Sequence, residues 1–275
     1  LINSKGVRQT PWSEGQNVRH LEPMGFIKFD LLGLSTLKMM EGCIEHILRR
    51  HHDIENPTFN DIKKYYDKTI HPDVVNLEDE KVYKNTFHRG KWAGIFQFTE
   101  GGAQNFCKRV KPNNIIDISA VTSIYRPGPL SADVHEEYIE AMAHPHRIKY
   151  LSDDSQEITE ETFGFLIFQE QIALLAHKLG GLTLDEGNKL RKVLTKKGTG
   201  KGGIKTKLRV KFVDGCAANG IDREAAIGLW NKFEFFSGYG FNKSHAVSYS
   251  MISYQCAWLW TYYPAEWMAS FLDKE

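Results

Sequence analysis

Residues 183–197 read TLDEGNKLRKVLTKK, and this stretch predicts a capped helix. Thr183 and Glu186 stand three residues apart, as the two partners of a capping box do. The helix is expected to continue through Leu190 to the pair Lys196-Lys197 and to stop at the glycine that follows. Acidic residues at its start and basic residues at its end complement the helix dipole. The stretch therefore indicates a helical region with a basic end.

The segments on either side carry further helical signals. Gly180-Gly181 is a natural helix stop, and a glycine-rich break at 237–240 precedes a long final helix. Short apolar runs predict strands at Met24–Asp30 and Gly94–Phe98. Helices are expected over residues 35–50, 59–66, 170–179, 204–219, 223–235 and 244–262. The fold class predicted is mainly α with a small β component.

Composition excludes several classes of protein. The 275 residues are 41% hydrophobic and 25% charged, which suits one large globular domain or two smaller ones. No apolar run approaches the ~20 residues that span a bilayer, so we expect no membrane partner and a cytoplasmic location. The four cysteines lack C-x-x-C spacing, which indicates reduced thiols rather than a zinc site. The start at Leu1 lacks an initiator Met and a signal core, and suggests an internal piece.

The net charge of +1 hides a basic segment. Residues 189–211 contain ten basic residues and no acidic one, whereas acidic residues gather at 78–80 and 153–161. Segments of this kind usually face polyanions. Arg suits bidentate phosphate contacts and Lys supplies a point charge, although a solvated basic helix is the alternative.

The glycine-rich stretch 198–203 is not a Walker A loop. Thr195 stands where that motif needs glycine, and Gly202 stands where it needs Ser or Thr. The stretch also follows a helix rather than a strand. A flexible basic loop beside nucleic acid is the better interpretation.

Three other places could carry chemistry. Lys28 and Asp30 alternate onto one face of the predicted strand, which suits phosphate and metal chemistry or, alternatively, an aspartate before a helix beside a surface lysine. The loop at 237–245 offers Lys243, His245 and backbone N–H groups at a helix start for a phosphate or base, or simply caps that helix with Asn242 or Ser244. The prolines after Arg126 hold it outside any regular element.

Seven blocks together resemble one family. They occur in the family's order across nearly the whole chain, which makes the resemblance specific: GFIKFDLLGL at 25–34, IFQF at 95–98, YRPGPL at 125–130, FQEQ at 168–171, LRK at 190–192, GYGFNKSH at 238–245 and YPAE at 263–266. The chain is similar to bacterial C-family replicative DNA polymerases, the DNA polymerase III alpha subunit. The resemblance implies that residues 1–34 are the end of a palm domain and sheet, followed by a large helical fingers domain at 35–275.

The resemblance also implies site residues. Asp30 would be the third catalytic carboxylate of the palm and a metal ligand, with Lys28 beside the primer terminus or phosphates. Arg191, Lys192, Lys197, Lys243, His245 and Arg126 would neighbour the triphosphate or template, and Lys196, Lys201, Lys205 and Lys207 would contact DNA. Lys192 stands where the family usually has an arginine. The implied reaction is two-metal nucleotidyl transfer with Mg²⁺, in which a primer 3′ hydroxyl attacks a dNTP.

One departure limits these expectations. The family's paired aspartates, D-x-D, have no counterpart in this sequence. The chain is therefore expected to need the remainder of a polymerase polypeptide, or a split companion subunit, in order to act on primer–template DNA. Replisome proteins such as the sliding clamp would bind through regions not present here. A non-catalytic helical DNA-binding module is the competing hypothesis.

Overall fold

A computed structural model describes residues 22–25, 33–126, 133–195, 203–237 and 240–274, together with residues 2, 4, 6 and 129. The chain divides into two units, Leu1–Ser35 and Thr36–Glu275. In the first unit, a short 3-10 helix, η1, covers Glu22–Met24. Most of the predicted strand Met24–Asp30, including Lys28 and Asp30, lies outside the described residues.

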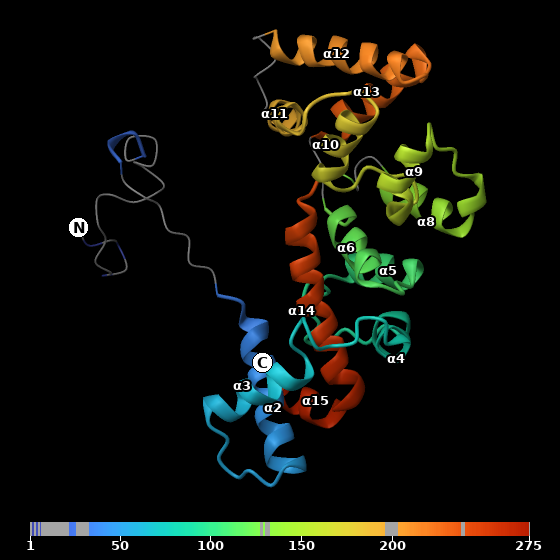
Figure 1. The fold of residues 1–275 in the computed structure, drawn as a ribbon. Coiled ribbons are helices and arrows are strands. Elements are labelled where there is room, and N and C mark those ends of the chain that lie inside the picture. The colour runs from blue at the N-terminus through green and yellow to red at the C-terminus, as the bar shows by residue number, and fades with distance from the viewer. Residues whose placement is uncertain are drawn as a thin grey trace. The chain divides into compact units, whose positions relative to one another are not determined.

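Helices dominate the second unit (Figure 1). The long ones are α2 (Ser35–His51), α3 (Phe59–Thr69), α5 (Gly101–Val110), α6 (Ile115–Ile124), α8 (Val134–Ala143), α10 (Gln169–Lys178), α11 (Leu184–Thr195), α12 (Ile204–Ala218), α13 (Arg223–Ser237), α14 (Lys243–Tyr262) and α15 (Pro264–Leu272). Shorter turns are α4 (Glu80–Val82), η2 (Tyr83–His88), η3 (Pro145–Arg147), α9 (Asp153–Thr159) and η4 (Glu160–Thr162). The β structure of the described residues amounts to isolated bridges, so the predicted fold class is confirmed.

The predicted helices form close to where the sequence places them. Thr183 and Glu186 make the predicted capping box, with Thr183 N donating to Glu186 Oε2 at 2.8 Å and Glu186 N donating to Thr183 Oγ1 at 3.2 Å. Asn242 caps α14 by accepting the His245 N–H at 2.8 Å. Side-chain oxygens satisfy helix N–H groups that would otherwise have no partner.

The predicted strand Gly94–Phe98 is wrong. Gly94 and Gln97 have positive φ values of 74° and 68°, which an extended strand does not allow. The segment forms turns instead, with Ile95 N bonded to Trp92 O and Phe98 N to Ile95 O. Ile95 and Phe98 are nevertheless fully buried. The apolar run therefore predicts the buried residues correctly, but it predicts the wrong backbone conformation for them.

Two hydrophobic clusters make up the core of the second unit. One surrounds α14, which contacts α6, η2 and α15 along its length (Figure 1). The other lies among α10, α11, α12 and α13 and is built around Trp230, Phe212 and Phe233. Leu166 belongs to the second cluster while Ile167 and Phe168 belong to the first. The segment that precedes α10 thus joins the two clusters.

All four cysteines are free and buried, and burial raises the pKa of the Cys216 thiol to about 11. Among the described residues, no helix combines the length and apolar character that crossing a bilayer requires.

Candidate functional site

The site begins with a backbone pairing between two distant segments. Phe168 and Phe241 form a parallel bridge, in which Gln169 N donates to Phe241 O at 2.8 Å and Phe241 N donates to Ile167 O at 3.0 Å. This pairing sets the start of α10 beside the start of α14. Segments that the sequence separates by some seventy positions therefore share one place in the fold.

Gln169 ties Arg191 to this pairing. Its side-chain oxygen accepts from Arg191 Nη1 at 2.8 Å, and its side-chain nitrogen donates to Gly240 O at 2.8 Å. A Cβ on Gly240 would lie 3.1 Å from Gln169 Cγ, so the close approach favours glycine there. The guanidinium on α11 is thereby held against the loop that leads into α14.

Phe241 connects two more of the predicted residues. The Arg126 guanidinium lies 4.3 Å from the centroid of the Phe241 ring, a cation–π distance, and Arg126 Nε donates to Ser123 O at 3.0 Å. Burial lowers the pKa of the Arg126 guanidinium below its usual value. The ring centroid of His245 lies 5.5 Å from that of Phe241. The Phe241 ring thus contacts both the Arg126 guanidinium and the His245 imidazole.

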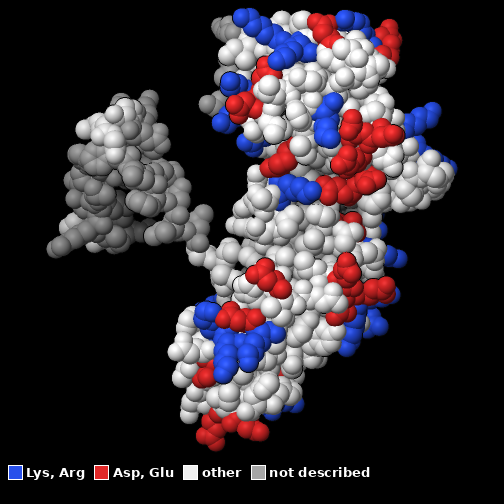
Figure 2. Space-filling view, in the orientation of Figure 1, with Lys and Arg blue, Asp and Glu red and all other residues white. Residues whose placement is uncertain are grey.

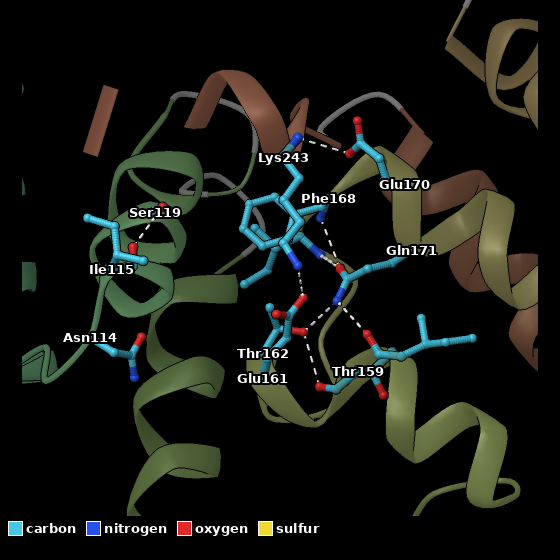
Figure 3. Close-up of polar contacts among 12 residues, drawn as sticks. Asn114, Ile115, Ser119, Thr159, Glu161, Thr162, Phe168, Glu170, Gln171 and Lys243 are labelled. Carbon is cyan, nitrogen blue, oxygen red and sulfur yellow. Dashed lines mark hydrogen bonds and ion pairs between the residues drawn. The ribbon is translucent and has the colours of Figure 1, made fainter. Parts of the chain in front are cut away.

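Lys243 has a carboxylate partner at each end (Figure 3). Its ammonium donates to Glu161 Oε1 at 2.5 Å, and its backbone N–H donates to Glu170 Oε2 at 2.9 Å. The backbone N–H groups of Lys243 and His245 are occupied, the second by Asn242. These two N–H groups therefore already have protein acceptors, and the alternative that Asn242 caps the helix is observed. Binding of a phosphate or base at this helix start stays a prediction.

The structure thus brings together four predicted residues around the Gln169–Phe241 pairing. They come from the segment just after α6, from α11 and from the first turn of α14: Arg126, Arg191, Lys243 and His245. Lys192 is exposed on α11 beside Arg191. Lys28, Asp30, Lys196, Lys197 and Lys201 lie outside the described residues.

The basic segment is partly neutralised by acids on neighbouring helices. Lys205 on α12 pairs with Glu234 on α13 at 3.2 Å, and Lys211 pairs with Glu186 on α11 at 2.6 Å. Lys207 is exposed on α12. Where α11, α12 and α13 lie, Figure 2 shows basic and acidic side chains interspersed. The tertiary structure therefore moderates the basic charge that the sequence concentrates in residues 189–211.

The described residues contain no group of three or more His, Cys, Asp or Glu side chains that could hold a metal ion. The predicted Mg²⁺ ligand, Asp30, is outside that part of the chain. Arg191 contacts Gln169 and the Lys243 ammonium lies over the Phe168 ring, so both basic side chains lie beside one backbone pairing. Arg and Lys side chains are common partners of anions.

Comparison with known proteins decides the family. The sequence model of the bacterial DNA polymerase III alpha subunit finger domain matches residues 47–220, well over half of the chain. This chain belongs to that finger-domain family. Its site residues Arg126 and Arg191 lie within the matched range, and Lys243 and His245 lie beyond it.

Curated relatives extend this similarity along the finger-domain chain. This chain is 38% identical over 256 residues to the DNA polymerase III subunit alpha of Campylobacter jejuni, and the match covers 93% of this chain. It is 34% identical over 261 residues to that of Vibrio cholerae and 33% identical over 259 residues to that of Helicobacter pylori. The chain spans about one fifth of the length of these relatives.

Sequence reasoning missed the acidic and amide side chains of this finger-domain site. Glu161 contacts the Lys243 ammonium and Gln169 contacts the Arg191 guanidinium, whereas Glu170 contacts the Lys243 backbone N–H. Gln169 and Glu170 lie in the block FQEQ, which carries the family resemblance without revealing a partner. Glu161 lies in an acidic run that resembles a solvated surface. Their roles follow from contacts across the fold, which no local pattern encodes.

Proposed function

We propose that this chain supplies the fingers of a DNA-directed DNA polymerase and grips an incoming dNTP and the template. The observation that carries the proposal is the convergence of Arg126, Arg191, Lys243 and His245 on the pairing between Gln169 and Phe241. These side chains come from α11, from α14 and from the segment that follows α6, and a polyanion contacted from several directions is both held and oriented.

The chemistry of nucleotidyl transfer suits this arrangement. Transfer of a phosphoryl group asks the protein mainly for positioning and for stabilisation of charge. Arg191 offers a planar fork for two phosphate oxygens, and Lys243 offers a compact point charge. Lys192 would add charge beside Arg191 without the fork. In this proposal, these side chains and Lys197 contact the triphosphate or template while Lys196, Lys201, Lys205 and Lys207 follow the phosphates of DNA.

The proposal extends to the residues that precede the fingers. Residues 1–34 would end a palm domain and residues 35–275 would form the fingers. Asp30 would hold Mg²⁺ together with aspartates outside this chain, and Lys28 would lie beside the primer terminus. The bound ions would stabilise charge on the attacking and leaving oxygens. Primer–template DNA, dNTPs, the rest of a polymerase polypeptide and, through it, a sliding clamp would be the partners, in the cytoplasm.

The deciding experiment is primer extension by a polypeptide that joins this sequence to the part carrying the paired aspartates. Asp30→Asn should lower the extension rate by about 100-fold or more, because it removes a stabilising ligand group. Asp73→Asn, which changes an exposed aspartate in the same way, should have no effect.

Two outcomes would contradict the proposal. Unchanged extension by the Asp30→Asn variant would exclude Asp30 from the chemistry. Robust extension by the purified 275-residue chain alone would show that no further carboxylates are needed. Retained primer–template binding together with full activity of Asp30→Asn would favour the non-catalytic DNA-binding module.

A further inference from the structure

Glu170 occupies an unusual position relative to α14. Its Oε1 accepts from Asn242 Nδ2 at 2.7 Å and its Oε2 accepts from the Lys243 N–H at 2.9 Å. Both donors belong to the N-terminal turn of α14, and a negative charge there is favoured by the helix dipole. One carboxylate of α10 therefore sets the backbone direction at the start of the helix that carries Lys243 and His245.

The backbone next to Glu170 is held in place by the side chain of Gln171. Its neighbour Gln171 is buried, and its side-chain oxygen accepts from the backbone N–H groups of Ile167 and Phe168, each at 3.0 Å. The Gln171 side-chain nitrogen donates to Thr162 Oγ1 at 2.7 Å and to Ile158 O at 3.2 Å (Figure 3). A side chain whose backbone is locked in this way holds a fixed position without reorganisation.

Glu161 makes a different kind of contact with Lys243. It lies on η4, and its carboxylate meets only the ammonium end of Lys243. The two side chains are 32% and 34% exposed, so water reaches the pair. Exposed ion pairs contribute little stability and exchange partners easily. The Lys243 ammonium also lies 5.7 Å from the Phe168 ring centroid, where it keeps a second favourable contact.

We propose that Glu170 is a positioning residue for the nucleotide-facing loop and that Glu161 is a competing partner which an anionic ligand displaces from Lys243. The inference rests on the proposed function, because it takes the ligand of Lys243 to be the triphosphate of a nucleotide. Glu170 acts through the backbone of α14 and does not touch the ligand. Glu161 holds the Lys243 ammonium until phosphate oxygens replace its carboxylate.

The two roles can be separated by the sign of their effects. Replacing either glutamate by glutamine removes one negative charge near the site, and simple Coulomb attraction then predicts tighter anion binding in both cases. A positioning role predicts weaker binding for Glu170→Gln. The glutamine NH₂ group would face either the Asn242 amide or the Lys243 N–H, and two donors cannot form a hydrogen bond. The same charge change should therefore strengthen binding at 161 and weaken it at 170.

The experiment measures binding of a fluorescent dATP to the full 275-residue chain by anisotropy, with inorganic triphosphate as competitor. Glu170→Gln should raise the Kd about tenfold, through loss of charge-assisted hydrogen bonds to the loop. Glu161→Gln should lower the Kd by about twofold to fivefold, since an exposed ion pair no longer competes. Glu157→Gln, the same change at an exposed glutamate of α9, should leave the Kd unchanged.

Amide hydrogen exchange supplies a second readout that does not depend on a ligand. Glu170→Gln should accelerate exchange at residues 243–246, whereas Glu161→Gln and Glu157→Gln should not. Glu170→Asp serves as a milder variant should the first unfold, and it should show the same local acceleration. Tighter dATP binding by Glu170→Gln, or unchanged exchange in the first turn of α14, would overturn the positioning role.

Lys243→Met separates the two proposals. A raised Kd for Lys243→Met with an unchanged Kd for Glu170→Gln would leave the proposed function standing and overturn the inference. An unchanged Kd for Lys243→Met would remove Lys243 from nucleotide binding, and both the proposed function at this residue and the inference built on it would fail.

Discussion

Asp117 shows how one buried side chain constrains this fold. Its Oδ2 accepts from Asn113 N at 2.9 Å, and its own N–H donates to Asn114 Oδ1 at 2.8 Å, which caps α6. The residue is only 5% exposed. Burial raises the pKa of the Asp117 carboxyl above its usual value, although hydrogen bonds from Asn113 and Asn114 act in the other direction.

The sign of the Asp117 pKa shift gives a prediction. Because the folded protein binds this proton more tightly than the unfolded chain does, the stability that Asp117 contributes is greatest in acid and is lost as pH rises through the folded pKa. Asp117→Asn cannot ionise, so its Tm relative to that of the unsubstituted protein should rise from pH 3 to pH 7. Over this pH range, the difference in the free energy of unfolding between the two proteins should change by an amount on the order of 1 kcal/mol, the scale of one hydrogen-bonded polar group.

Thermal unfolding across that pH range checks the prediction. Asp185→Asn, at an exposed aspartate of α11, is the matched control, and it should not show the same rise in relative Tm with pH. A constant difference in Tm between Asp117→Asn and the unsubstituted protein would show that the buried carboxyl does not govern this part of the pH dependence.

At the scale of elements, two glycines let α12 approach the end of α10. A Cβ on Gly215 would lie 1.9 Å from the carbonyl oxygen of Gly180, and a Cβ on Gly180 would lie 2.2 Å from the Phe212 ring. Asn219 donates from its side chain to Leu179 O at 2.9 Å at the same crossing. The second core cluster therefore depends on backbone surfaces that carry no side chain.

Gly215→Ala should consequently destabilise the chain by about 2 kcal/mol, because an added methyl group overpacks a close backbone contact. Gly228→Ala is the matched control on α13. A Cβ there meets no atom within 4 Å, and the better helix propensity of alanine should stabilise the protein by about 0.5–1 kcal/mol. Urea unfolding measures both values. Equal effects of the two substitutions would contradict this account of the α10–α12 crossing.

At the scale of the whole molecule, charge is distributed by the fold as well as by the sequence. Among the described basic residues of the segment 189–211, Lys205 pairs with Glu234 and Lys211 pairs with Glu186 on neighbouring helices. Hydrogen bonds from Lys211 and from the Thr183 backbone lower the pKa of Glu186, which keeps this carboxylate ionised to lower pH. A phosphate contact by Lys205 or Lys211 would therefore have to replace a carboxylate partner.

Binding of primer–template DNA should depend steeply on salt if this surface follows phosphates, because each neutralised phosphate releases counterions. Lys207→Gln should weaken binding for all sequences and reduce the log–log salt slope by about one. Lys68→Gln, at an exposed lysine of α3, should leave the slope unchanged. Anisotropy titrations between low and moderate salt measure the slope. An affinity independent of salt would exclude phosphate contacts as the main source of binding.

The sequence by itself determined many of the helices and two of their caps, whereas α5, α6, α8 and α15 were not predicted. Thr183 with Glu186 and Asn242 with His245 are local partners, three residues apart, and their hydrogen bonds need no distant neighbour. It also carried the prediction of which basic side chains face a nucleotide, because the blocks LRK and GYGFNKSH hold both the charges and the family resemblance. Local pattern could not specify the conformation of Gly94–Phe98, where positive φ values and buried side chains coexist.

Only the tertiary structure decided how the site is assembled. The bridge between Phe168 and Phe241 and the contacts of Glu161 and Glu170 with Lys243 join segments that are far apart along the chain. Such pairings arise because burial of apolar surface forms two adjacent hydrophobic clusters. The segment before α10 belongs to both clusters, and this placement brings its polar neighbours into contact with the start of α14. Burial of apolar surface has no direction, so a sequence states which residues enter the core but not which charges will meet beside it.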